Sequence, residues 1–223
     1  MKIYNISTSY TNSLLLEKID GGRVLDVGGS EYPMRANLIA ENVKGSEVTM
    51  LDMTEPRQIL SEKLSFIKMP LEDASPSVLG TFRHILLSNV LEHLVSPANG
   101  LKVCAGILED GGCVHILSPN CESLNRRIGL IMGEMSSIRD ISPNEVAMGH
   151  LHALNVQDVL DAISDAGLVI EEYFGVLLKP LPTPEMITWP EKRIDAFFKI
   201  APSVSSELCH EVYFRARKPA KRP

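Results

Sequence analysis

A short apolar run that ends in adjacent glycines is the feature that most constrains this chain. The run covers Val24–Val27 and suits a buried strand, and Gly28-Gly29 follow it at once. Glycine lets the backbone bend sharply and approach a ligand closely. In a doubly wound sheet, ligands bind beyond the carboxyl ends of the strands. The pattern therefore predicts a first strand that leads directly into a ligand-binding turn.

Short apolar runs alternate with amphipathic stretches over most of the remaining length. The expected strands are Arg23–Val27, Glu47–Leu51, Ser65–Lys68, His84–Leu87 and Cys113–Leu117. The expected helical segments are Met34–Asn42, a short turn near Arg57–Glu62, and Pro97–Leu108, with Gly111-Gly112 ending the last of these. Such alternation is typical of βαβ units with helices on both faces of a parallel sheet. We therefore expect an α/β, doubly wound fold.

The second half of the chain is less regular. A helix is expected over Asn155–Ala166, capped by Asn155 and closed by Gly167. An apolar run, Leu168–Leu178, follows it, and a final strand is expected over Cys209–Arg215. We interpret residues 1–223 as one domain with lid or acceptor-binding insertions near 125–152 and 179–205.

Composition excludes several partners. The 223 residues carry a net charge of −6, which disfavours long nucleic acids because phosphate contacts need a concentrated basic surface. The four cysteines show no metal-ligand spacing, and no run approaches a membrane helix in length. We expect a soluble, cytoplasmic protein that binds a small molecule and neither nucleic acid nor membrane, as a monomer or a homodimer.

Polar residues follow the expected strands in a set order. Asp52 ends the second strand, 24 residues beyond Gly28, where an acid can accept both hydroxyls of a ribose. Glu72-Asp73 follow the third strand, and the fourth ends in Ser88-Asn89-Val90-Leu91-Glu92-His93-Leu94. Asp26 precedes the glycines, which suits a cationic ligand better than the pyrophosphate of a dinucleotide.

This ordered set resembles the class I S-adenosylmethionine (SAM)-dependent methyltransferase family, particularly its small-molecule members and the ubiquinone-biosynthesis group. The resemblance implies a seven-stranded, mostly parallel sheet whose last strand is antiparallel. It also implies that Gly28 lies under the cofactor, Asp52 holds the ribose and Glu72-Asp73 border the adenine. Ser30 and Tyr32 stand where the family often has glycine. The predicted cofactor-binding residues are Asp26, Gly28, Gly29, Ser30, Asp52, Met53, Leu71, Glu72, Asp73 and Asn89.

The histidines raise two possibilities, a metal site and a catalytic base. In the ubiquinone-biosynthesis group a Glu-x-x-Glu-His pattern is associated with a divalent metal, but here Asn89 replaces the first acid and leaves Glu92-His93. Such a set is weak for a hard cation, so we expect no metal site. His150 and His152 precede the helix at Asn155. They are our candidates for a catalytic base, with capping of that helix as the alternative.

These patterns together predict transfer of a methyl group from SAM to a small molecule. The expected acceptor is a hydroxyl oxygen of a sugar or secondary-metabolite intermediate. Three alternatives remain: N-methylation of a small metabolite, a SAM-binding module without activity, and a dinucleotide-dependent oxidoreductase.

Overall fold

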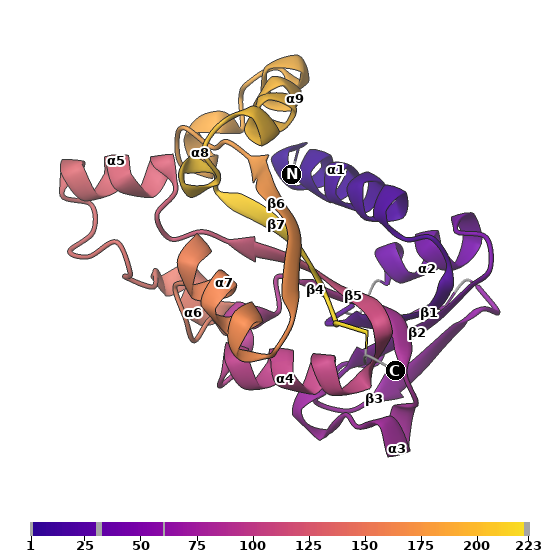
Figure 1. The fold of residues 1–223 in the computed structure, drawn as a ribbon. Coiled ribbons are helices and arrows are strands. Elements are labelled where there is room, and N and C mark those ends of the chain that lie inside the picture. Colours follow the sequence, from indigo (N-terminus) through magenta and orange to yellow (C-terminus); the bar gives the residue numbers. More distant parts are fainter. Residues whose placement is uncertain (1, 30–32, 60, 221–223) are drawn as a thin grey trace.

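The computed structural model describes residues 2–29, 33–59 and 61–220, the first four of these by their backbone alone. Seven strands form one sheet in the order β3-β2-β1-β4-β5-β7-β6 (Figure 1). The strands are β1 (Gly22–Val27), β2 (Ser46–Asp52), β3 (Leu64–Lys68), β4 (Phe82–Ser88), β5 (Leu108–Pro119), β6 (Val169–Leu177) and β7 (Glu211–Arg217). Strands β1 to β5 pair in parallel, and β7 is antiparallel to both β5 and β6. The predicted fold class is confirmed.

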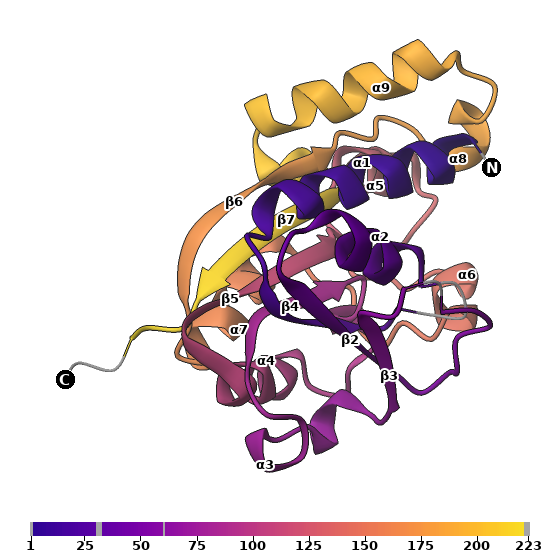
Figure 2. The same ribbon diagram turned by 90° about the vertical axis from the view of Figure 1, so that its right-hand side faces the viewer.

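Helices cover both faces of the sheet (Figure 2). The helices of one face are α1 (Lys2–Lys18), α2 (Met34–Asn42) and α9 (Glu191–Ile200), and those of the other are α3 (Pro76–Leu79), α4 (Pro97–Ile107) and α7 (Val156–Asp165). Each layer has its own apolar core. The core side chains of β1 and β4 are almost fully buried and mostly apolar, with Asp26 and His84 as buried polar exceptions.

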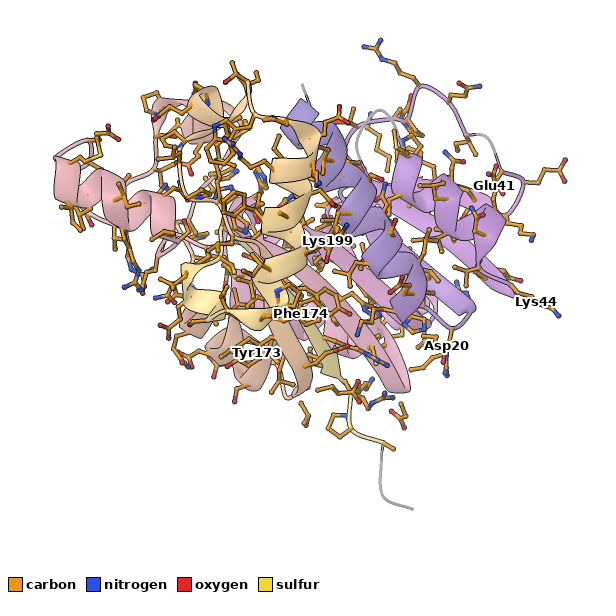
Figure 3. The ribbon with its side chains drawn as sticks, turned by 90° about the horizontal axis from the view of Figure 1, so that it is seen from above. Asp20, Glu41, Lys44, Tyr173, Phe174 and Lys199 are labelled. Carbon is orange, nitrogen blue, oxygen red and sulfur yellow. The ribbon has the colours of Figure 1, made fainter. Side chains whose placement is uncertain are left out.

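Helix α1 is absent from the predicted elements. It lies beside α9 (Figure 3), where the rings of Tyr10 and Phe198 are 5.0 Å apart. The ammonium of Lys18 donates to Glu172 at 2.6 Å, which holds the carboxyl end of α1 on β6. The apolar spacing Ile6-Tyr10-Leu14 indicates this helix in the sequence.

One further boundary differs from expectation. Gly111-Gly112 lie inside β5 rather than at a helix end, because α4 ends at Ile107 and the strand begins at once. Gly112 has a backbone oxygen only 2.9 Å from where its Cβ would lie, so the strand needs glycine there. The turn expected near 57–62 falls partly outside the described residues. The cap at Asn155 is confirmed, since its side chain accepts from the Asp158 amide at 2.8 Å.

The remaining elements lie around the carboxyl edge of the parallel strands. They are the short helices α5 (Leu124–Met132), α6 (Pro143–Ala147) and α8 (Thr183–Met186), and the 3-10 turns η1 (Leu71–Asp73), η2 (Leu91–His93), η3 (Ala201–Ser203) and η4 (Ser206–Leu208). Helix α5 projects away from the sheet, while α6, α8 and the amino end of α1 gather near that edge. Among the described residues, no helix combines the length and apolarity required to span a bilayer.

Candidate active site

The glycine turn after β1 has the geometry that the sequence predicts. Gly28 has a φ of +71°, and its amide donates to the Leu51 carbonyl at 2.9 Å. A Cβ on Gly29 would lie 2.5 Å from the sulfur of Met50, and one on Gly28 would lie 3.0 Å from Val90. Gly28 therefore adopts a left-handed backbone conformation that favours glycine, and Gly29 has no room for a side chain.

Asp26 lies beneath this turn and is completely buried. Its Oδ1 accepts from the Nε and Nη2 atoms of Arg35 at 3.0 and 2.5 Å. Its Oδ2 has no hydrogen-bond partner in the described chain and is 3.7 Å from the Cβ position of Gly29. Burial raises the pKa of Asp26 against the lowering effect of the Arg35 charge. The unpartnered oxygen can accept a hydrogen bond on the side of the turn, which fits a cationic or hydrogen-bond-donating ligand.

A cavity of about 300 Å³ opens at the turn, and we name it the glycine-turn cavity. Its lining joins α1 to the carboxyl ends of β1 and β4 and to the first residue of β7. The lining residues are Ser7, Thr8, Thr11, Asn12, Gly28, Gly29, Met34, Arg35, Ser88, Asn89 and Glu211. Of the predicted cofactor residues, Gly28, Gly29 and Asn89 line it directly.

A second cavity of about 170 Å³ adjoins the first, and we name it the Lys179 cavity. It is lined by Ser7, Asn89, Pro119, Leu177, Lys179, Thr183, His210 and Glu211. Three residues line both cavities: Ser7, Asn89 and Glu211. The two spaces therefore meet at these side chains.

Asn89 is held in an unusual conformation at this junction. Its φ is +53°, in the left-handed region that asparagine tolerates better than most residues. Its backbone amide donates to the Leu117 carbonyl of β5 at 2.9 Å, which fixes the turn after β4. Such strained positions cluster at functional sites because the surroundings must hold them in place.

Glu211 is the ionisable group at the junction. It begins β7, paired with Pro119 of β5 and Leu177 of β6, and only 8% of it is exposed. Burial raises its pKa to about 7, and a hydrogen bond with the Asn89 side chain opposes that rise. A carboxyl group that titrates near neutrality and faces two cavities is suited to proton transfer.

The other predicted cofactor residues lie at the same sheet edge. Asp52 ends β2 and its Oδ1 accepts from the Thr54 amide at 2.8 Å, and Met53 beside it is exposed. The turn η1 places Leu71 in the core and leaves Glu72 and Asp73 exposed. These five residues do not line the glycine-turn cavity. Ser30 and Tyr32 lie outside the described residues.

The predicted catalytic histidines lie away from the junction. His152 contacts the Leu94 carbonyl through Nε2 at 3.0 Å. His150 lines a pocket of about 20 Å³ together with Arg126, Glu145 and His210, and burial lowers its pKa. That pocket shares His210 and Pro119 with the Lys179 cavity. The catalytic role of the two histidines stays a prediction.

His150 also brings a third donor to Glu92 and His93. The ligand atoms of the three residues lie within 4.8 Å of one another, and both carboxylate oxygens of Glu92 lack a partner in the described chain. Burial raises the pKa of Glu92 to about 7. Two imidazoles and one carboxylate suit Zn²⁺ better than Mg²⁺. The sequence pattern indicated only Glu92 and His93 as donors, because His150 is distant from them in the sequence.

Sequence reasoning missed most of the junction. Ser7, Thr8, Thr11 and Asn12 belong to the unpredicted α1, whose apolar spacing was the available signal. Lys179 follows the antiparallel strand β6, and Glu211 begins the antiparallel strand β7. Nothing in the local sequence shows that these two residues come near Asn89, which follows β4.

Comparison with known proteins shows partial matches in sequence and a shared fold. No family model matches the chain. The ubiquinone biosynthesis O-methyltransferase of Vibrio parahaemolyticus is 32% identical over 127 residues, covering 51% of this chain and 50% of that protein. The chain thus spans about half the length of the curated relatives that it matches first.

Two solved structures share the fold over nearly the whole chain. An S-adenosylmethionine-dependent methyltransferase from Mesorhizobium loti has a TM-score of 0.61 at 15% identity, covering 93% of this chain and 95% of that one. A 1,6-didemethyltoxoflavin-N1-methyltransferase from Burkholderia thailandensis, with S-adenosylhomocysteine bound, has a TM-score of 0.58 at 16% identity, covering 98% and 78%. By its sheet order and by its likeness to these solved structures, the chain has the fold of SAM-dependent methyltransferases.

Proposed function

We propose that this protein transfers a methyl group from SAM to a hydroxyl oxygen of a small molecule. The observation that carries the proposal is the meeting of two cavities at Ser7, Asn89 and Glu211. One cavity holds the glycine turn of a fold used by SAM enzymes, and the other leaves space for an acceptor. Because fold alone does not fix chemistry, the proposal rests on this junction.

The residues at the glycine turn fit the cofactor. The unpartnered Asp26 oxygen and the cavity lined by Gly28 and Gly29 are features of a ligand cradle. Gly28, Gly29 and Asn89 would hold the cofactor, and Asp52 with the Glu72-Asp73 turn would extend that site along the same edge. When bound, SAM supplies a methyl group on a positively charged sulfur.

Glu211 gives this chain a base at the junction. A hydroxyl acceptor must lose its proton as the new carbon–oxygen bond forms, and the Glu211 carboxylate would take it. Its pKa of about 7 leaves a substantial ionised fraction at neutral pH. General-base catalysis contributes roughly 10²–10⁴-fold in rate. We therefore place the base at Glu211 in preference to His150 and His152.

The two insertions expected from the sequence are candidates for acceptor binding within one domain. Lys179 and Thr183 come from the 179–205 segment and line the Lys179 cavity. Arg126, Glu145 and His150 come from the 125–152 segment and line the adjoining small pocket. An acceptor in these spaces would lie between both segments.

Calorimetric titration with SAM, S-adenosylhomocysteine and NAD tests the cofactor assignment. We expect micromolar binding of both adenosyl ligands and none of NAD. Binding of NAD alone would favour an oxidoreductase. Adenosyl binding without methyl transfer to any of a broad panel of hydroxyl and amine acceptors would favour a binding module.

A further inference from the structure

Lys179 is a buried cation inside the Lys179 cavity. It follows β6 by two residues and stands in the sequence Leu178-Lys179-Pro180-Leu181-Pro182, whose prolines stiffen the backbone. Only 9% of the residue is exposed. The Leu178 amide donates to the Phe197 carbonyl at 3.3 Å, which ties the segment to α9. The backbone that carries Lys179 is therefore fixed beside the cavity that this residue lines.

Lys179 makes no hydrogen bond or ion pair with the residues that the structure describes. Burial lowers its pKa, and the charge of Glu145 partly opposes this. Glu145 is already engaged, because it accepts from the Ser142 amide at 2.7 Å and pairs with Arg126 at 3.3 Å. A buried charge without a partner is costly, so such a group is retained where a ligand supplies the partner.

The neighbouring groups do not compete for that ligand. Arg126 donates to the carbonyls of Cys121, Ile138 and Asp140 as well as to Glu145, so its guanidinium is already satisfied. Burial, with smaller contributions from the charges of Lys179 and Arg126, lowers the pKa of His210 to about 3. His210 is therefore neutral, and its Nδ1 is buried without a partner in the described chain. Lys179 is left as the cation of this cavity.

We propose that Lys179 binds a carboxylate on the methyl acceptor. The inference rests on the proposed function and names the acceptor class: a small hydroxylated carboxylic acid. Because the Glu211 carboxyl group lines the same cavity, a singly charged carboxylate adds less uncompensated buried charge than a phosphate dianion would. Since Glu211 lines the same cavity where it meets the glycine turn, the acceptor lies with its carboxylate at Lys179 and its hydroxyl toward Glu211.

The test compares benzoate with benzamide, two probes of the same size that differ in charge. Calorimetry or ligand-detected NMR gives the affinity of each probe for the wild type, Lys179→Met and Lys179→Arg, with and without S-adenosylhomocysteine. Lys44→Met is the matched control, because Lys44 is an exposed lysine on the turn after α2 and lines neither cavity.

We expect the wild type to bind benzoate at least about tenfold more tightly than benzamide. Lys179→Met should remove that preference, while Lys179→Arg and Lys44→Met keep it. Lys179→Met should also unfold at the wild-type temperature or above, because it deletes an unpaired buried charge. Equal affinity for the two probes in the wild type, or an unchanged preference in Lys179→Met, overturns the inference.

The two proposals fail separately. Loss of S-adenosylhomocysteine binding in the wild type would overturn the methyltransferase proposal, while the benzoate preference measured without that ligand still decides the role of Lys179. Conversely, tight adenosyl binding with no carboxylate preference overturns the acceptor class alone.

Discussion

Arg35 donates two hydrogen bonds to one oxygen of the Asp26 carboxylate, while the other oxygen is buried without a partner in the described chain. The pair joins the first turn of α2 to the end of β1, directly under the glycine turn. It leaves the acid half satisfied at the place where a cofactor is expected.

Removing the arginine should destabilise the protein strongly. Arg35→Met leaves a fully buried carboxylate unpaired, which costs about 3–5 kcal/mol. Urea unfolding at pH 7 measures the loss, and Asp26→Asn/Arg35→Met should recover part of it because the charge is gone. The loss should shrink at low pH, where Asp26 is protonated. Equal stability of Arg35→Met and wild type at pH 7 would show that the pair contributes nothing.

Asp52 should contribute to cofactor affinity. Asp52→Ala removes charged hydrogen bonds worth about 1.5–3 kcal/mol, or roughly tenfold to a hundredfold in SAM affinity. Asp52→Asn separates this effect from loss of the Thr54 turn, since the amide oxygen can still accept there. Glu55→Ala, at an exposed acid nearby, is the control. SAM affinity that is unchanged in both Asp52 variants contradicts the ribose assignment.

Glu211→Gln should lower kcat by roughly 10²–10⁴-fold with a small change in KM. The carboxylate is the active form, so kcat/KM of the wild type should rise with pH through about 7 and level off above it. The positive sulfonium of bound SAM favours the ionised form of Glu211 and so lowers its pKa. The pH at which kcat rises should therefore be lower than the pH at which kcat/KM rises. The variant should lose this rise, and Glu41→Gln on the exposed side of α2 should keep it. A wild-type profile in Glu211→Gln would return the role to the histidines.

Methyl transfer should not require Mg²⁺. The cluster of Glu92, His93 and His150 has one carboxylate, and burial keeps that group partly protonated near neutrality. We expect activity to survive chelation with EDTA and to be indifferent to added Mg²⁺. Activity lost on chelation and restored by a divalent ion, together with its absence in His93→Ala, would instead establish a metal site.

Stability should fall in acid through the histidines of the sheet. His84 and His115 are hydrogen-bonded to each other at 3.0 Å, and His115 to Tyr213 at 2.8 Å. Burial holds the pKa of His115 well below 6.5. The unfolded chain therefore takes up the proton first, and stability is lost as pH falls below about 6.5.

His115→Gln measures this contribution. The amide can keep a donor and an acceptor but does not titrate. Between pH 6.5 and 5 the wild type should lose more stability than the variant, as followed by urea unfolding. Parallel pH curves for the two proteins would contradict a neutral buried His115.

The sequence alone determined the fold class, the positions of the parallel strands along the chain and the glycine turn. Local physics suffices for these, because buried strands leave apolar runs, and Gly28-Gly29 occupy positions where a Cβ strains or clashes. The cap at Asn155 was readable for the same reason: its partner, Asp158, lies one helical turn away.

Only the tertiary structure decided what faces the turn. Glu211 and Lys179 belong to the antiparallel end of the sheet, and they meet Asn89 only after β7 inserts between β5 and β6. Their burial, not their spacing, removes water from their charges and shifts their pKa values. Pairings between residues so distant in sequence leave no local pattern, so the base and the buried cation could be found only in the folded chain.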